Sequence, residues 1–379
     1  MRSLSSIIFY FFVILTLSHF STSTEYLKLP LLPRTARPSP SHLLSADLRR
    51  LTSPLTSGAA TGSGQYFADL RLGSPPQRLL LVADTGSDLV WVKCSACRNC
   101  SAHRPGSTFL PRHSSTFSSH HCYDSPCRLV PHPTQQHCDN RSKIHTPCRY
   151  QYSYADTSTT AGFFSSETTT FNTSSNKPTT FQHLSFGCGF RISGPSVTGS
   201  SFNGAQGVMG LGRGPISFTS QLARKFGNTF SYCLLDYTLS PPPKSYLTIG
   251  ASPSHKLLSY TPLLTNPLSP SFYYISVEGV SVDAVNLPIA RSVWAIDADG
   301  NGGTVVDSGT TLTFLPEPAY RQVLAAFRRH VRLPAAEAPA PGFDLCLNVS
   351  GAARPRLPKL RFRLHGKAVL APPPGNYFI

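Results

Sequence analysis

The sequence predicts a mainly β protein built from two related lobes. Charged residues make up only 14% of the 379 residues while Ser, Thr, Pro and Gly are abundant, which favours many short strands joined by turns. One pattern, an apolar strand running into an acid, a hydroxyl, a glycine and a hydroxyl, occurs at residues 84–87 and again at 307–310. Removable N-terminal segments would leave roughly 320 residues, enough for two domains or one large bilobal unit.

The N-terminus has the three parts of a secretory signal, expected at residues 1–23: Arg2, an apolar run over 7–17 and small polar residues over 18–24. A buried strand is the alternative interpretation of that run. The run is too short to span a bilayer and no later segment approaches ~20 apolar residues, so no membrane span is expected after signal removal. Residues 24–62 are expected to be a removable prosegment and junction, although a disordered leader fits the composition equally well.

Residues 63–250 are expected to form the first lobe and 251–379 the second. Alternation from Tyr66 to Leu72 indicates a strand, and the continuous apolar run over 79–83 indicates a strand buried on both faces that ends at Asp84. Residues 149–171 suit a hairpin. Two helices are expected, over 218–226 and over 317–331, the longer with one apolar face made of Tyr320, Val323, Leu324, Phe327 and Val331.

The insertion over residues 94–148 holds seven cysteines and seven histidines but few apolar runs. It therefore cannot build its own hydrophobic core and must be held by cross-links. Cys94-x2-Cys97-x2-Cys100 could in principle ligate zinc. An oxidising secretory route favours disulfides instead, so no metal and no other cofactor is predicted, and the histidines are expected at the surface. The disulfide candidates are Cys94, Cys97, Cys100, Cys122, Cys127, Cys138, Cys148, Cys188, Cys233 and Cys346, and the glycosylation candidates are Asn99, Asn140, Asn172 and Asn348.

The net charge of +16, with a pI near 9.6, would suit a polyanionic partner such as a nucleic acid or an anionic cell-wall polymer. The basic residues are scattered, however, and they do not interleave with aromatic residues as in a nucleic-acid module. We therefore expect no nucleic-acid partner, and we interpret the charge as a solvated basic surface.

The repeated turn motif carries the chemistry. An acid at the end of a buried strand is costly unless its carboxylate is hydrogen-bonded; the hydroxyls that follow can donate to it, and the glycine permits the turn. If a pseudo-twofold axis relates the lobes, the two turns meet and bring Asp84 close to Asp307. Two such carboxylates share one proton, which supplies an acid and a base for activating water against a carbonyl group.

At these motifs the chain resembles the pepsin-like aspartic proteases, in the atypical cysteine-rich plant group that includes the nepenthesin-like enzymes. The resemblance extends from about Tyr66 to the last residue. It rests on both turns, on the cysteine-rich insertion, and on four further segments: Tyr154-Ala155-Asp156-Thr157-Ser158, Phe186-Gly187-Cys188, Gly207-Val208-Met209-Gly210-Leu211-Gly212 and Phe230-Ser231-Tyr232-Cys233.

The resemblance implies a bilobal double-β-barrel fold, an active-site cleft between the lobes, and an aspartic endopeptidase whose nucleophilic water lies between Asp84 and Asp307. It implies that Tyr154 lies on a flap over the substrate, with Trp91 as its hydrogen-bond partner. Ala155 stands where the group usually has glycine, and Thr157 stands at a position that is often small or glycine. The other turn residues would support the site. Ser87 and Thr310 would donate to the outer carboxylate oxygens, and Thr85 and Ser308 would bond across the two turns. Gly86 and Gly309 would lie between them in each turn.

The partners expected on this basis are polypeptide substrates, bound by a monomer secreted to the apoplast or cell wall, or alternatively delivered to the vacuole. The segment 207–212 completes the first lobe, and no equivalent follows Asp307, from which only 72 residues remain to Ile379. The second lobe is therefore expected to be incomplete, Cys346 to lack its partner, and the chain to be poorly stable or weakly active. The alternatives are a non-catalytic binding or inhibitor protein on this scaffold, an inactive truncated form and, third, a secreted metal-binding module.

Overall fold

The computed structural model describes residues 27–32, 66–98, 108–133, 138, 146–154, 156–172, 178–198, 202, 204–234, 245–250, 258–310, 312–337, 343–352 and 355–378. The expected signal at 1–23 lies outside these residues, as do Asn99, Asn140, Cys100 and Ala155. Within the described ranges, no helix is both long and apolar enough to cross a membrane.

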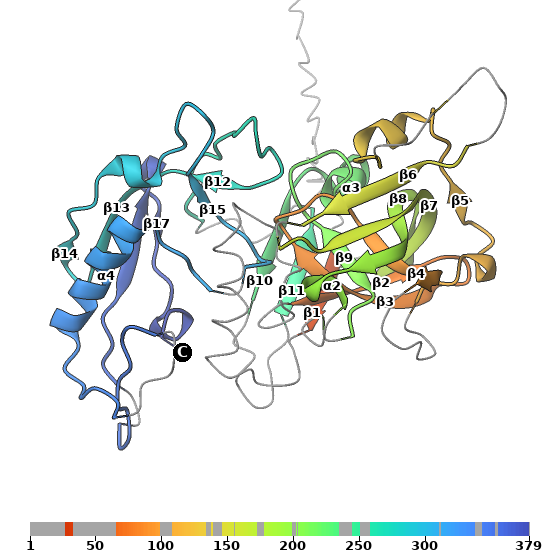
Figure 1. Ribbon diagram of the computed structural model, residues 1–379. Coiled ribbons are helices and arrows are strands. Elements are labelled where there is room, and N and C mark those ends of the chain that lie inside the picture. The colour runs from red at the N-terminus through yellow and green to blue at the C-terminus, as the bar shows by residue number, and fades with distance from the viewer. Residues whose placement is uncertain are drawn as a thin grey trace, which may run out of the picture.

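The described residues form two β lobes, the larger of which is built on an 11-stranded sheet (Figure 1). The order in this sheet is β10-β11-β1-β2-β3-β9-β4-β8-β7-β5, with β6 paired to β7. The strands are β1 (Leu27–Leu32), β2 (Phe67–Leu72), β3 (Gln77–Asp84), β4 (Trp91–Arg98), β5 (Ser118–Ser119), β6 (Arg149–Ser153), β7 (Thr159–Asn172), β8 (Pro178–Ser193), β9 (Gly207–Gly210), β10 (Phe230–Cys233) and β11 (Ser245–Ile249). The lobe also carries the helices α2 (Pro195–Thr198) and α3 (Phe218–Phe226) and the 3-10 turns η2 (Pro111–His113) and η3 (Ser125–Leu129). The mainly β, bilobal prediction is confirmed.

Strand β3 is the element that positions the first turn. It lies between β2, which is antiparallel, and β9, which runs parallel and pairs Gly210 with Asp84. Leu79, Leu81 and Ala83 point into one apolar cluster, whereas Val82 packs into a second cluster on the opposite face. The continuous apolar run thus forms a strand buried on both faces, as its sequence predicts, and it delivers Asp84 to its end.

Part of the expected prosegment is a strand of this sheet. β1 lies between β11 and β2, with Leu27 opposite Ile249 and Leu31 opposite Ala68. The sequence does not indicate this strand, whose short apolar run contains Pro30, a residue without the N–H that a strand ladder uses. Removal of residues 24–62 stays a prediction, and it would take β1 out of the sheet.

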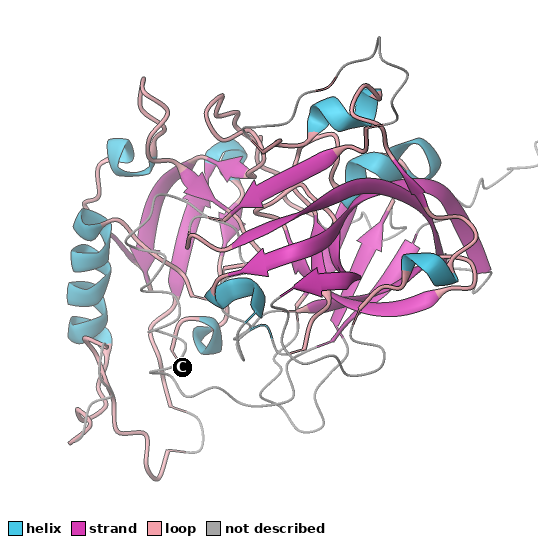
Figure 2. Ribbon diagram, turned by 45° about the vertical axis from the view of Figure 1, so that its right-hand side comes forward, coloured by secondary structure: helices cyan, strands magenta, loops and turns pink. Residues whose placement is uncertain are grey.

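The smaller lobe packs one helix on a four-stranded sheet of order β14-β13-β16-β17, as Figures 1 and 2 show. The buried face of its helix α4 consists of Ala319, Val323, Ala326 and Phe327. The predicted apolar face was wrong in part, because Tyr320, Leu324 and Val331 are only half-buried while the small alanines are buried in their place. The elements are β12 (Tyr274–Ile275), β13 (Val277–Val282), β14 (Val285–Asn286), β15 (Thr304–Val305), α4 (Glu317–His330), β16 (Leu360–Leu364), β17 (Val369–Leu370), η5 (Arg291–Trp294), η6 (His365–Lys367) and η7 (Pro374–Asn376).

Disulfides staple the cysteine-rich insertion, joining Cys94 to Cys188, Cys122 to Cys138 and Cys127 to Cys148. Cys97 belongs to β4. Two candidates are not bridged: Cys233, exposed at the end of β10, and Cys346, on the second lobe, are free cysteines. They have no partner among the other described cysteine side chains, because those six are already joined to one another.

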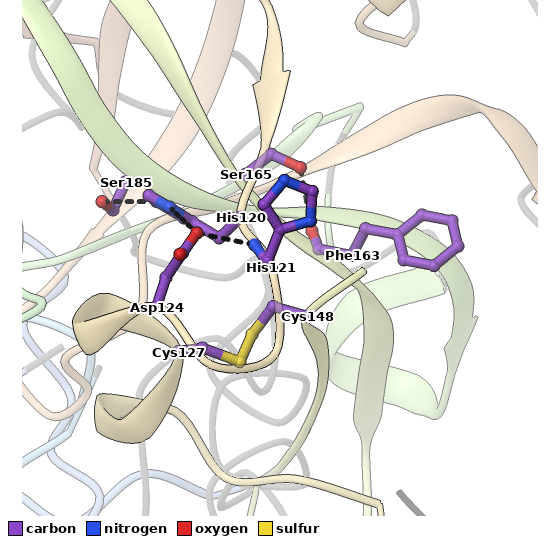
Figure 3. Close-up of polar contacts among 8 residues, drawn as sticks. All are labelled: His120, His121, Asp124, Cys127, Cys148, Phe163, Ser165 and Ser185. Carbon is purple, nitrogen blue, oxygen red and sulfur yellow. Dashed lines mark hydrogen bonds and ion pairs between the residues drawn. A yellow bond between two sulfur atoms is a disulfide. The ribbon is translucent and has the colours of Figure 1, made fainter. Parts of the chain in front are cut away.

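The histidines of the insertion are not all surface residues. The His120 side chain is only 16% exposed, and its Nε2 lies 3.0 Å from Ser185 Oγ (Figure 3). Its ring also packs on Phe164. Burial lowers the pKa of His120, although Asp124 nearby works in the opposite direction. The surface prediction was therefore wrong for His120, because the neighbouring strands β7 and β8 supply a polar partner and an aromatic face that cover the ring.

One group in the insertion has the composition of a metal site. Potential ligand atoms of Cys127, Cys148 and His132 lie within 4.8 Å of one another. Both sulfurs are joined in the disulfide drawn in Figure 3, so neither is a thiolate. His132 Nδ1 lies 2.8 Å from the Arg149 carbonyl oxygen and is already occupied. These three residues therefore do not fit a zinc site.

Candidate active site

The two repeated turns face one another across the lobes. Asp307 Oδ1, Asp307 Oδ2 and Asp84 Oδ1 each lie 3.2 Å from the position that a Cβ atom on Gly86 would occupy. The carboxylates therefore converge on the same small volume, and a side chain at position 86 would crowd both of them. Asp84 is fully buried, whereas Asp307 is half-buried.

The first turn satisfies the carboxylate at its head. Gly86 N–H donates to Asp84 Oδ1 at 3.0 Å, and Ser87 Oγ donates to Asp84 Oδ2 at 2.5 Å. Ser87 is itself fully buried. A buried carboxylate needs such donors, and here the residues two and three positions further along the chain provide them.

The second turn repeats the pattern. Gly309 N–H donates to Asp307 Oδ1 at 3.0 Å, and Thr310 Oγ1 donates to Asp307 Oδ2 at 2.7 Å. The two tetrapeptides thus adopt the same local hydrogen bonding although Ser and Thr are exchanged between them. This places the inner oxygen of each carboxylate on a backbone N–H and the outer oxygen on a hydroxyl.

The hydroxyls in the second position of each turn bind across the lobes. Ser308 N–H donates to Thr85 Oγ1 at 2.8 Å, and Thr85 N–H donates to Ser308 Oγ at 3.2 Å. Thr85 Oγ1 also donates to Asp307 Oδ1 at 3.0 Å, and Ser308 Oγ donates to the Ala83 carbonyl oxygen at 2.9 Å. These reciprocal bonds hold the two carboxylates at a fixed separation.

Tyr154 follows β6 at the tip of the β6–β7 hairpin, which is the predicted flap. Trp91 Nε1 donates to Tyr154 Oη at 2.6 Å, and the indole ring is stacked on Phe202. Burial raises the pKa of Tyr154 well above its ordinary value, and the charges of Tyr152 and Asp84 add to that effect. The structure thus brings Tyr154 and Trp91 together, near the charge of Asp84.

Sequence reasoning missed two tyrosines and an acid at this site. Tyr152 packs edge-on against Tyr154, and burial together with the charges of Asp88 and Asp84 raises its pKa. Burial and the charge of Asp307 raise the pKa of Tyr232 to about 12. The alternation of side chains along the hairpin could have placed Tyr152 and Tyr154 on the same face of it. Their distance from Asp84 depends on the tertiary packing of the hairpin, which no local pattern gives.

The two turns are supported unequally. Strand β3 has neighbours on both sides, whereas β15 is only two residues long and, among the described residues, pairs with β12 alone. Val306, just before Asp307, is 39% exposed, but Ala83, just before Asp84, is 3% exposed. The turn at Asp307 is also hydrogen-bonded to the first lobe, through Thr85.

Two of the predicted glycosylation acceptors fall on described residues. Asn172 is exposed at the end of β7, and Asn348 is exposed on the second lobe. Both amides are therefore accessible for modification, which stays a prediction.

The comparisons with known proteins agree on one family. The family model described as Xylanase inhibitor N-terminal matches residues 66–251, and the one described as Xylanase inhibitor C-terminal matches residues 272–379. "Aspartyl protease family protein 2" of Arabidopsis thaliana is 36% identical over 329 residues, covering 86% of this chain and 64% of that protein. "Aspartic proteinase nepenthesin-2" of Nepenthes gracilis is 36% identical over 306 residues (80% of this chain, 65% of that protein). "Aspartic proteinase nepenthesin-1" of the same plant is 35% identical over 343 residues (88% and 73%).

The chain thus spans 64–65% of the length of the first two relatives. Among solved structures, the one described as edgp has a TM-score of 0.66 at 21% identity, covering 91% of this chain and 82% of that one. Basic 7S globulin from soybean has a TM-score of 0.64 at 19% identity, covering 92% and 82%. At these identities the structural likeness establishes the fold.

Proposed function

The chain belongs to the plant pepsin-like aspartic proteases of the nepenthesin-like group, and on that basis we propose that it is an aspartic endopeptidase in which Asp84 and Asp307 activate water. The observation that carries the proposal is the convergence of both carboxylates on Gly86, with reciprocal bonds between Thr85 and Ser308. A single buried Asp in a turn would be unremarkable, but two with matched donors in facing turns form a pair.

The chemistry follows from the charge of such a pair. Two carboxylates this close share one proton, so one acts as a base and the other as an acid. The ionised member accepts a proton from water as the water oxygen attacks the peptide carbonyl carbon, and the protonated member donates to the carbonyl oxygen. The outer hydroxyl donors, Ser87 and Thr310, would hold each carboxylate in plane during this exchange. Activity at acidic pH is expected, since a second ionisation removes the shared proton.

Polypeptides are the proposed substrates, held in the interlobe cleft under the flap that carries Tyr154. We also propose a secretory route, with a signal at 1–23, a prosegment and junction over 24–62, and lobes over 63–250 and 251–379, in a monomer. The three disulfides support an oxidising compartment. The apoplast or cell wall is the proposed destination, and the vacuole is the alternative.

A second candidate function is binding without catalysis. It is favoured by the descriptions of the matching family models, which name xylanase inhibitors. In this function the chain would bind and slow a glycan-degrading enzyme. The fully formed hydrogen bonding of both turns supports the peptidase, since a binding protein has no need of a buried, matched carboxylate pair.

One experiment separates the two candidates. The purified chain is incubated with an acid-denatured protein at several pH values, with and without pepstatin, beside the variants Asp84→Asn and Asp299→Asn. We expect acid-dependent, pepstatin-sensitive cleavage that is lost in Asp84→Asn and retained in Asp299→Asn, because Asp299 is exposed and belongs to neither turn. Absence of cleavage by the unaltered chain, with inhibition of a xylanase in a parallel assay, would favour the binding function instead.

A further inference from the structure

A third carboxylate, four residues after Asp84, joins the two lobes. Asp88 Oδ1 accepts a hydrogen bond from Gly214 N–H at 2.8 Å in the first lobe, and Asp88 Oδ2 accepts one from Ser271 Oγ in the second. Asp88 is half-buried, and the proposed chemistry makes no use of it.

The surrounding backbone is shaped to this carboxylate. A Cβ atom on Gly212 would lie 2.3 Å from Asp88 Oδ1, and one on Gly214 would lie 2.2 Å from Asp88 Oδ2. Any other residue at these two positions would displace the carboxylate or the chain. Because Gly212 and Gly214 have no side chains, the Asp88 carboxylate has the space in which it accepts the hydrogen bond from Ser271.

The bonds of Asp88 continue to the second turn. Ser271 leads toward β12, and just before that strand the Tyr273 carbonyl oxygen accepts a hydrogen bond from Val306 N–H at 3.0 Å. The next pair, Tyr274 opposite Val305, belongs to the β12–β15 ladder. A change in the position of Ser271 would thus reach Val306, the residue directly before Asp307.

Two more bonds reinforce the same joint. Arg213 N–H donates to the Ser271 carbonyl oxygen at 3.0 Å, and Tyr273 Oη donates to the Leu211 carbonyl oxygen at 2.7 Å. Because these bonds tie the segment leading into β12, the strand that pairs with β15, to the first lobe, the joint is well placed to fix where Asp307 lies.

We propose that Asp88 is a positioning residue, which through Ser271 and β12 sets the turn of Asp307 against the turn of Asp84. The catalytic consequence rests on the proposed peptidase function, whereas the structural part does not. The joint lies apart from the Thr85–Ser308 bonds, so the two act as separate constraints on the same pair of turns.

The test compares Asp88→Ala, Asp88→Asn, Ser271→Ala and Ser271→Thr with the control Glu337→Gln, which alters an exposed carboxylate of the second lobe. Peptide hydrolysis gives kcat and KM, and hydrogen exchange is followed by mass spectrometry on the peptides that cover 304–310 and 317–330. For Asp88→Ala and Ser271→Ala we expect kcat to fall about 10- to 100-fold with KM within about threefold, because the reacting groups are misplaced while the cleft is intact.

Exchange over 304–310 should be at least ~10-fold faster in both alanine variants, while exchange over 317–330 in α4 stays unchanged. Ser271→Thr keeps the hydroxyl and should behave like the unaltered chain, as should Glu337→Gln; Asp88→Asn keeps an acceptor and should be less impaired than Asp88→Ala.

If Asp88→Ala does not fold, Ser271→Ala, which removes one oxygen, carries the test. If the unaltered chain proves inactive, the peptidase proposal fails, and the role of Asp88 is then tested only by the rate of hydrogen exchange over 304–310. Unchanged exchange there in Ser271→Ala and in every folded Asp88 variant would overturn the inference.

Discussion

Asp84 and Asp307 have matching hydrogen-bond partners in unlike surroundings. Asp84 is fully buried and Asp307 is half-buried, yet each accepts from the N–H two residues on and from the hydroxyl three residues on. The motif indicated that the hydroxyls could donate to the carboxylate or to nearby backbone, and the family resemblance assigned Ser87 and Thr310 to the outer oxygens; the glycine N–H donors were not predicted. The approach of Asp88 to Ser271 spans 183 residues and two lobes, so no local pattern could indicate it.

His120 provides a prediction on pH. Its folded pKa lies below the ordinary value of 6.5 because of burial, so the unfolded chain takes up a proton before the native chain does. Its contribution to stability is complete above about pH 6.5 and is lost as the pH falls toward the folded pKa. We expect His120→Gln, which can still bond to Ser185, to show a smaller drop in Tm between pH 7 and pH 5 than the unaltered chain.

The matched control is His113→Gln, an exposed histidine in the same insertion. Its Tm should fall with pH as much as that of the unaltered chain. Equal drops for His120→Gln and His113→Gln in thermal scans at the two pH values would show that burial of His120 does not couple folding to protonation.

Individual elements differ in how far the sequence determines them. Helix α3 has the bounds predicted from its pattern, because Ser217 caps its start by accepting from Ser220 N–H and Gly227 ends it at a φ of 82°. The buried face of α4 was predicted less well, since contact with a sheet selects the small Ala319 and Ala326 that a search for large apolar residues passes over. β1 went unpredicted because its pairing with β11 brings together residues more than 200 positions apart.

The flap tip is a strained element. Thr157 adopts a φ of 69°, which a β-branched residue rarely does. We expect Thr157→Gly to raise the free energy of unfolding by about 1 kcal/mol, since relief of strain outweighs the greater freedom of the unfolded chain. Urea unfolding at fixed pH measures this change.

Thr180→Gly is the comparison, because Thr180 is an exposed threonine in β8 outside the set of residues with positive φ. There glycine should lower the free energy of unfolding by about 1 kcal/mol. If Thr157→Gly destabilises the chain as Thr180→Gly does, the tip is not strained.

The molecule as a whole is two unequal lobes that share one site. The duplicated motif predicted that the two turns meet on the condition that a pseudo-twofold axis relates the lobes, and the family resemblance implied the bilobal arrangement. The duplication could not predict the unequal strand pairing of the two turns, with β3 flanked by β2 and β9 while β15 pairs with β12 alone among the described residues.

The central claim is that Asp84 and Asp307 act as one catalytic unit, and a mutant cycle tests it most directly. The kcat/KM for a peptide substrate at acidic pH is measured for the unaltered chain, Asp84→Asn, Asp307→Asn and the double variant. Each single change should lower kcat/KM by at least ~10³-fold, and the double variant should fall no further, because either loss disables the shared proton and the water. Appreciable activity in either single variant, or losses that multiply in the double variant, would contradict the claim.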